Sequence, residues 1–176
     1  MNKIEEARKK FKPVIVKCLL IAESAPDINS KRFFYYDEYF KNGDILFMET
    51  MKALFLVDGV TGKHYKENKS AYLYKFQNAG FYLEDASSIP FPKGSSPNFK
   101  KRILEKEFSF LLIRLQSIIS KKTPIVLIAN TVYDVCFDRL NHEGFNVMNT
   151  NAIPFPISNQ SVFRADLVDC VSRINL

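Results

Sequence analysis

The sequence predicts an α/β fold, a three-layer α/β/α sandwich around a four-stranded, mostly parallel sheet. Two observations support this prediction. The apolar runs at residues 14–21 and 124–129 are rich in β-branched residues, which is typical of strands buried on both faces of a parallel sheet. Segments with helical spacing alternate with such runs along the chain, an order that favours parallel pairing.

The first half of the chain is expected to form four elements after a short amphipathic helix at residues 4–12, which Pro13 ends. A strand at 14–21 leads into a polar loop. Asp44 is expected to cap a helix that reaches about residue 57. The elements that complete this half are a helix at 68–79, stopped by Gly80, and a strand at 81–86.

The second half begins with an irregular, proline-rich segment at residues 89–97. Apolar side chains at helical spacing then predict a long amphipathic helix at 98–120. The remaining elements are a strand at 124–129, a helix at 131–142, a strand at 144–148 and a final helix at 160–174. Ligands of such folds bind beyond the carboxyl ends of the strands, so the loops there are the candidate site.

Composition limits the class of protein but not its activity. The 176 residues fit one domain, 1–176, and 47% apolar residues exclude a disordered chain or a collagen. The 25 basic and 19 acidic residues leave a net charge of +6, which favours a polyanionic partner such as nucleic acid. The alternative is that the lysines only solvate the surface.

The cysteines predict a reducing environment. Cys18, Cys136 and Cys170 have no metal-binding or cluster spacing, so buried free thiols and a cytoplasmic location are expected, with no metal and no cofactor. No signal peptide or membrane span is expected, and hence no membrane partner. The sequence leaves the oligomeric state open.

The loop after the first strand carries the candidate catalytic groups, Glu23 and Asp27, with Ser24 between them. A carboxylate in this position can orient a water molecule or stabilise a developing cation. The alternative is a loop carboxylate that only accepts backbone hydrogen bonds.

Ala22-Glu-Ser-Ala-Pro26 resembles the first motif of the uracil-DNA glycosylase superfamily, which in one branch is a strand followed by Gly-Glu-Ala-Pro-Gly. The order of elements is similar too. The resemblance implies a uracil-DNA glycosylase-like fold and excision of a flipped base from DNA. Glu23 would take the motif's acidic position, and Pro26 would match the motif's proline. Pro154 would match the proline of the family's His-Pro-Ser motif. Ile153 stands where that motif has histidine, and the first glycine of the first motif is Ala22.

An aromatic cluster follows the candidate loop, with basic residues beside it. Its members are Phe33, Phe34, Tyr35, Tyr36, Tyr39 and Phe40, and the adjacent cations are Lys31 and Arg32. Aromatic faces interleaved with cations suit stacked bases, so one ring from Phe33 to Tyr36 is a candidate for base stacking. The alternative is that these rings belong to the core.

The loop before the last helix is the second candidate contact region. It contains Pro154 and Phe155, and Ser158 or Asn159 is expected to cap the helix that follows. A phosphate could bind at this helix start with the help of Arg164.

Two asparagines after strands, Asn130 and Asn149, are candidates for reading a base edge. His64 and His142 are expected at the surface.

Three hypotheses for function remain open from the sequence. The first is a DNA base glycosylase without the usual motif histidine. The second is a non-catalytic module that binds nucleic acid or a nucleotide on the same fold. The third is a protein-interaction domain that uses the aromatic loop as an exposed apolar surface.

Overall fold

The computed structural model describes residues 3–27, 29–30, 32–37, 44–56, 60–157 and 159–175. The strands in the described residues are β1 (Cys18–Ser24), β2 (Phe81–Ser87), β3 (Pro124–Leu127) and β4 (Asn146–Val147). They form one sheet in the order β2-β1-β3-β4, and every pair of neighbours is parallel. The predicted α/β class with a four-stranded parallel sheet is therefore confirmed.

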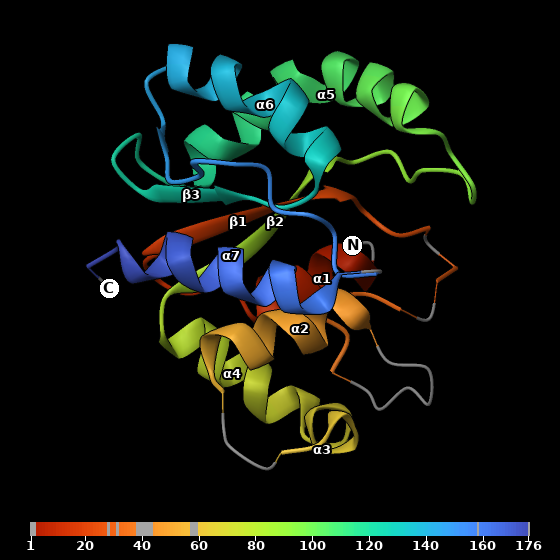
Figure 1. Cartoon of the computed structure of the whole chain (residues 1–176), viewed down its shortest axis with the longest axis vertical. Helices are drawn as coiled ribbons and strands as arrows, with labels where there is room; N and C mark the ends of the chain where they lie inside the picture. The colour runs from red at the N-terminus through yellow and green to blue at the C-terminus, as the bar shows by residue number, and fades with distance from the viewer. Residues whose placement is uncertain are drawn as a thin grey trace.

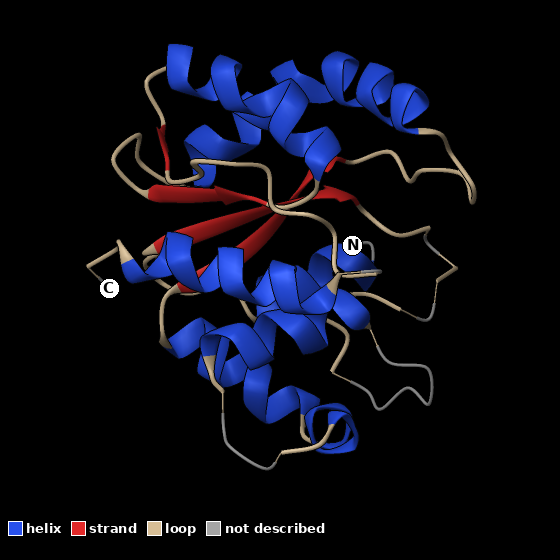
Figure 2. Ribbon diagram, in the orientation of Figure 1, coloured by secondary structure: helices blue, strands red, loops and turns tan. Residues whose placement is uncertain are grey.

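Helices cover both faces of the sheet. The helices are α1 (Lys3–Lys10), α2 (Ile45–Leu54), α3 (Gly62–Glu67), α4 (Lys69–Asn78), α5 (Pro97–Ile118), α6 (Asn130–His142) and α7 (Gln160–Ser172). Figure 1 shows α5 and α6 on one side of the sheet, with α1, α2, α4 and α7 on the other. The secondary-structure colouring of Figure 2 makes the layers plain: the strands lie between two groups of helices.

The core is built around β1, which lies between β2 and β3. Its first five residues, 18–22, are buried. The predicted start of this strand at residue 14 is wrong, because Val14 and Ile15 are exposed to solvent. The partner strand β2 begins only at Phe81, which pairs with Cys18, and the Lys17 amide donates to the Gly80 carbonyl just before it, so β2 offers no residue opposite Val14 and Ile15. Cys18, Cys136 and Cys170 are free and buried, as predicted.

Side-chain caps explain where several helices begin. Asp44 accepts a hydrogen bond from the Phe47 amide and starts α2, as predicted. The Thr61 hydroxyl accepts from the His64 amide and starts the six-residue helix α3, a helix that the sequence pattern does not predict. Gly80 ends the turn after α4 at a φ of +85°, and a Cβ there would lie 2.7 Å from the Lys17 side chain. Glycine is therefore required at this turn.

Two side chains satisfy backbone groups where the sheet has no further strand. The Tyr35 hydroxyl donates to the Leu83 carbonyl (3.1 Å) and accepts from the Leu83 amide (2.6 Å) on the outer edge of β2. The Asn149 amide group does the same for Leu127, at 3.0 and 2.6 Å, beyond the end of β4. Because buried backbone groups need partners, both side chains take the place of a missing strand residue.

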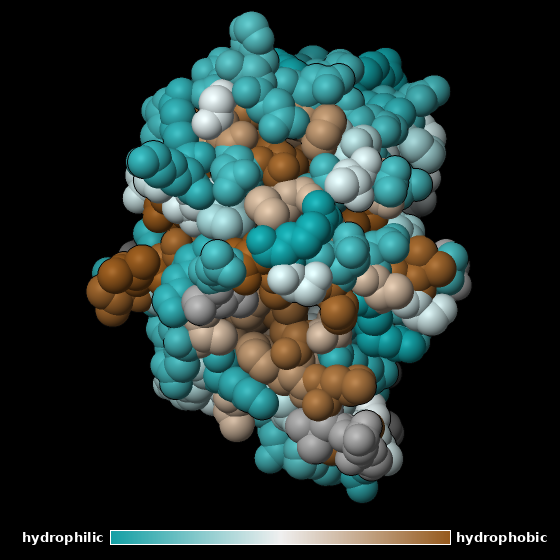
Figure 3. Space-filling model, turned by 60° about the vertical axis from the view of Figure 1, so that its left-hand side comes forward, coloured by the Kyte–Doolittle hydropathy of each residue, from teal (hydrophilic) through white to brown (hydrophobic). Residues whose placement is uncertain are grey.

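Hydrophilic side chains cover most of the surface in Figure 3, and apolar groups gather in a band across its middle. Exposed apolar side chains include Val14, Ile15 and Leu56. Among the described helices, none is both long and apolar enough to cross a membrane.

Substituting Tyr35→Phe should lower the free energy of unfolding by about 1–3 kcal/mol. The change removes one hydroxyl and leaves the buried Leu83 amide and carbonyl without that partner. Urea denaturation measures the loss. Tyr74→Phe is the matched control, because Tyr74 is 45% exposed. Equal stabilities of the two variants would contradict the role of the Tyr35 hydroxyl as hydrogen-bond partner of the outer edge of β2.

Candidate functional site

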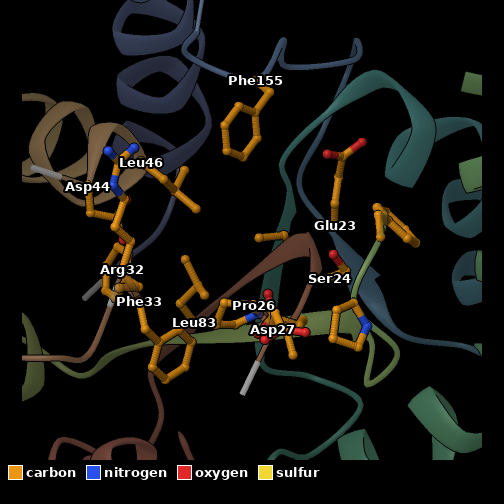
Figure 4. A pocket seen from close by; sticks show the side chains of 16 residues that line it. Glu23, Ser24, Pro26, Asp27, Arg32, Phe33, Asp44, Leu46, Leu83 and Phe155 are labelled. Atoms are coloured by element: carbon orange, nitrogen blue, oxygen red, sulfur yellow. The ribbon is translucent and has the colours of Figure 1, made fainter. Parts of the chain in front are cut away.

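A cavity of about 260 Å³ opens at the carboxyl ends of β1 and β2. This volume is slightly smaller than the range of about 300–1,000 Å³ that is typical of small-molecule pockets. The candidate loop contributes its wall from Glu23 to Asp27, and Phe155 comes from the loop before α7. In the view of Figure 4, Phe155 lies above the cavity, with Leu46 on one side and Glu23 on the other. The cavity thus brings together the predicted loop after β1 and Phe155 from the predicted loop before α7.

Glu23 is held in one orientation by two helices from the same layer. Lys100, in the first turn of α5, donates from Nζ to both carboxylate oxygens at 2.9 and 3.1 Å. The Thr131 hydroxyl, in the first turn of α6, donates to Oε1 at 2.6 Å. The Glu23 side chain is 16% exposed, so the carboxylate is fixed, charge-paired and still in contact with the cavity. A carboxylate has about four acceptor positions, and these bonds leave room for one more.

Ala129 makes the Thr131 contact possible through an unusual backbone conformation. Its φ is +83°, and among the described residues it is the only non-glycine residue with a positive φ. Its amide donates to the Ile153 carbonyl (2.9 Å), and its own carbonyl accepts from Val132 and Tyr133. This turn joins β3 to α6 directly. Strain of this kind concentrates at functional sites.

Asp27 lies at the cavity mouth and is exposed. Its Oδ1 accepts from the Asn29 amide at 2.8 Å, and its carbonyl accepts from Ser30. These bonds form a tight turn that fixes the carboxylate. Ser24, the last residue of β1, lies between the two carboxylates and also lines the cavity.

Asp85 is a third carboxylate of the cavity and was not among the predicted site residues. It is 4% exposed, and its Oδ2 pairs with Arg8 of α1. Burial raises the pKa of its carboxyl group to about 6, although Arg8 opposes the shift. The available signal was the occurrence of two acids, Glu84 and Asp85, within an otherwise apolar strand.

The aromatic cluster is mostly core. Phe33, Phe34, Tyr35 and Tyr36 are each 4% exposed or less, although Phe33 and Phe34 line the cavity. The expectation that any of the four could offer a face to a base is therefore corrected for Tyr35 and Tyr36: Tyr35 seals β2, and Lys3 of α1 lies over the Tyr36 ring. The burial of these four rings also means that they do not form the exposed aromatic docking surface of the third hypothesis. Tyr39 and Phe40 lie outside the described residues.

A buried lysine holds this aromatic segment in place. Lys69, the first residue of α4, donates from Nζ to the Phe33 carbonyl at 2.8 Å and lies over the Phe47 ring. It is 7% exposed. Burial lowers the pKa of its ammonium group from 10.5 to about 8, and Asp44 and Asp37 oppose the shift.

Several predicted contacts lie away from the cavity. Arg164 pairs with the fully buried Glu49 of α2, so it holds α7 against α2 and is not the predicted phosphate contact. The polar groups of Asn149 are used by Leu127 and by the Asn151 carbonyl, which corrects its assignment as a base reader. Asn130 is exposed at the start of α6 and does not line the cavity.

The loop before α7 contributes one residue to the cavity. Ile153 is buried and forms a parallel bridge to Ile128, which positions Phe155 over the cavity while Pro154 stays half-buried. Asn159 begins α7 without a side-chain cap, so the predicted cap is wrong for Asn159. Lys31 and Ser158 lie outside the described residues, whereas Arg32 is exposed and lines the cavity mouth.

Further lining residues were not singled out from the sequence: Asp44, Leu46, Leu83, Pro90 and Phe91. Pro90 and Phe91 lie in the segment after the second strand, at a strand end where the fold class predicts ligand binding. His64 and His142 are exposed, as predicted. Within the described residues, no group of three or more histidine, cysteine or acidic side chains is arranged to hold a metal.

Comparison of the chain with family models, with curated proteins and with solved structures finds no match. The site is therefore interpreted from its own geometry.

Substituting Ala129→Gly should raise the free energy of unfolding by up to about 1 kcal/mol. A non-glycine residue in such a conformation costs about 1–3 kcal/mol, which exceeds the roughly 0.5–1 kcal/mol that glycine loses in chain entropy. Urea denaturation measures the change. Ala71→Gly, at an exposed position of α4, should instead lower stability. A loss at both positions would show that Ala129 is not strained.

Substituting Lys69→Met should change how stability depends on pH. The folded pKa of about 8 lies below 10.5, so between these values the unfolded chain binds more protons and wild-type stability rises with pH. The contribution of Lys69 is complete above pH 10.5 and is lost as the pH falls through 8. The stability difference, wild type minus variant, should therefore grow by up to about 3 kcal/mol over this window. Denaturation at each pH measures both stabilities. If the stability of wild type and that of the variant changed equally with pH, the lowered pKa of Lys69 would be contradicted.

Proposed function

We propose that the chain is a uracil-DNA glycosylase-like enzyme that accepts the base and sugar of one flipped nucleotide in this cavity and hydrolyses the N-glycosidic bond between them. The observation that carries the proposal is the convergence of Glu23, Asp27 and Phe155 on one cavity of about 260 Å³. A cavity of this size suits a single base and its sugar better than a longer segment of nucleic acid.

The two carboxylates have environments that suit different tasks. Asp27 is exposed and fixed by its turn, so solvent water reaches it and it can orient the attacking molecule. Glu23 is partly buried and held by Lys100 and Thr131, which suits electrostatic stabilisation of an oxocarbenium-like sugar without reorganisation. Thr131 and Lys100 are positioning residues in this scheme.

The resemblance to the superfamily is consistent with this arrangement. Glu23 and Pro26, the two residues that match its first motif, both line the cavity. Phe155, which follows the proline matched to the second motif, lies on the opposite wall (Figure 4). The net charge of +6 favours DNA as the polymer.

Purified protein should release a base from an oligonucleotide that contains uracil, hypoxanthine or an alkylated purine. Glu23→Gln and Asp27→Asn should each slow release by about 100-fold or more, since each removes a charge that acts on the transition state. Chromatography of the free base measures release. Glu105→Gln, at an exposed position of α5, is the control and should keep full activity.

A non-catalytic binding module is the second candidate, and the Lys100–Glu23 ion pair favours it because the pair partly neutralises the candidate catalytic carboxylate. The outcome that selects it is DNA binding that weakens with salt in the absence of any base release. Release that is unchanged in both carboxylate variants would overturn the assigned roles.

A further inference from the structure

The charges around the cavity are mostly negative. Four of its lining residues are acidic, namely Glu23, Asp27, Asp44 and Asp85, and Arg32 is the one basic residue among the described lining residues. Lys100 and Arg8 pair with Glu23 and Asp85 from behind the wall. These pairs reduce the negative charge but do not reverse it, so the interior disfavours a phosphate or another anion.

Aromatic rings complete the wall. Phe33, Phe34, Phe91 and Phe155 come from three separate segments of the chain. Phe33 and Phe91 each have a protein cation over the ring, Arg8 at 5.4 Å and Lys100 at 5.6 Å. Phe155 is half-buried and extends toward the cavity from the loop above it (Figure 4). Aromatic faces combined with carboxylates are the groups that bind organic cations.

The cavity also has few groups that could assist a leaving anion. Among the described residues no histidine or lysine lines it, and the polar donors are Ser24 and Arg32. A neutral base such as uracil leaves the sugar as an anion and needs a donor or a positive charge nearby. A base that already carries a positive charge leaves as a neutral molecule and needs neither.

We propose that the preferred ligand of this cavity is a nucleobase with a positive charge, such as an N-alkylated purine. This inference rests on the proposed function for its reaction, but the binding preference stands on the cavity alone. In the reaction, a water oxygen forms a bond to C1′ and the C1′–N bond breaks. The electron pair of the broken C1′–N bond moves to the base nitrogen and cancels the positive charge of the base. The water proton passes through Asp27 to solvent.

Two isomeric nucleosides test the charge preference directly at pH 7. 1-Methyladenosine is protonated and cationic at this pH, whereas its isomer N6-methyladenosine carries the methyl group on N6 and is neutral. Calorimetric titration of the full chain should give about tenfold tighter binding of the cation, equivalent to about 1.4 kcal/mol, from cation–π and carboxylate attraction. Equal or tighter binding of the neutral isomer would overturn the inference.

Charge-neutral variants of the wall make the test specific. Asp27→Asn keeps the acceptor for the Asn29 amide and removes one negative charge, so the preference should fall several-fold. Asp134→Asn is the matched control: Asp134 is 44% exposed, pairs with Lys101 and does not line the cavity, so the preference should stay unchanged. If Asp27→Asn preferred the cationic nucleoside as strongly as wild type does, the negative charge of the wall would not be the cause of the preference.

Base release separates this inference from the proposed function. One oligonucleotide contains 7-methylguanine and a second contains uracil at the same position. Faster release of 7-methylguanine supports both proposals. Release of uracil alone supports the glycosylase and overturns the cation preference. Selective binding of 1-methyladenosine with no release from either strand supports the cation site and overturns the glycosylase. Absence of both binding and release overturns both.

Discussion

Parallel pairing of β1 on both of its sides is the constraint on which the rest of the structure depends. Cys18 to Ser24 pair with β2, and Leu19 to Ile21 pair with β3, so the strand has no free edge and residues 18–22 are buried. Because the neighbours are parallel, their carboxyl ends meet at one edge of the sheet. The loops that follow β1 and β2 must therefore share a small volume, and the cavity is formed in that volume.

The narrow sheet is completed by side chains. Tyr35 and Asn149 each supply one donor and one acceptor to a single residue, Leu83 on β2 and Leu127 on β3. An open strand edge invites pairing with another chain, and the buried hydroxyl of Tyr35 closes β2 at its middle. Tyr35 directly follows Phe33 and Phe34, which line the cavity. One short segment therefore both closes the edge of β2 and forms part of the cavity wall.

Sequence patterns predicted what depends on local residue types. The caps, the glycine stop and the strand ends are local, and Asp44, Gly80, Glu23 and Asp27 were identified from them. The predictions from sequence patterns were wrong for residues whose role depends on a partner that is distant in the chain. Arg164 pairs with Glu49, and Asn149 with Leu127, and neither partner is visible in a local window. Val14 and Ile15 look like strand residues, but no strand lies beside them. Asp85 begins a segment in which ligand binding was expected, but it was not singled out as a site residue because its partner Arg8 lies far away in the chain.

The Arg8–Asp85 pair connects the beginning of the chain to the cavity. Arg8 is 7% exposed, and α1 also pairs with Asp37 through Lys10 at 2.5 Å. If α1 detaches, Asp85 loses the counter-charge that opposes the rise of its pKa, so the charge state of the cavity wall changes. Any ligand that is sensitive to that charge then binds with a different affinity, and by thermodynamic reciprocity its binding alters how firmly α1 is attached. Residues 3–10 are in this sense part of the binding equilibrium, although α1 contributes no residue to the wall itself.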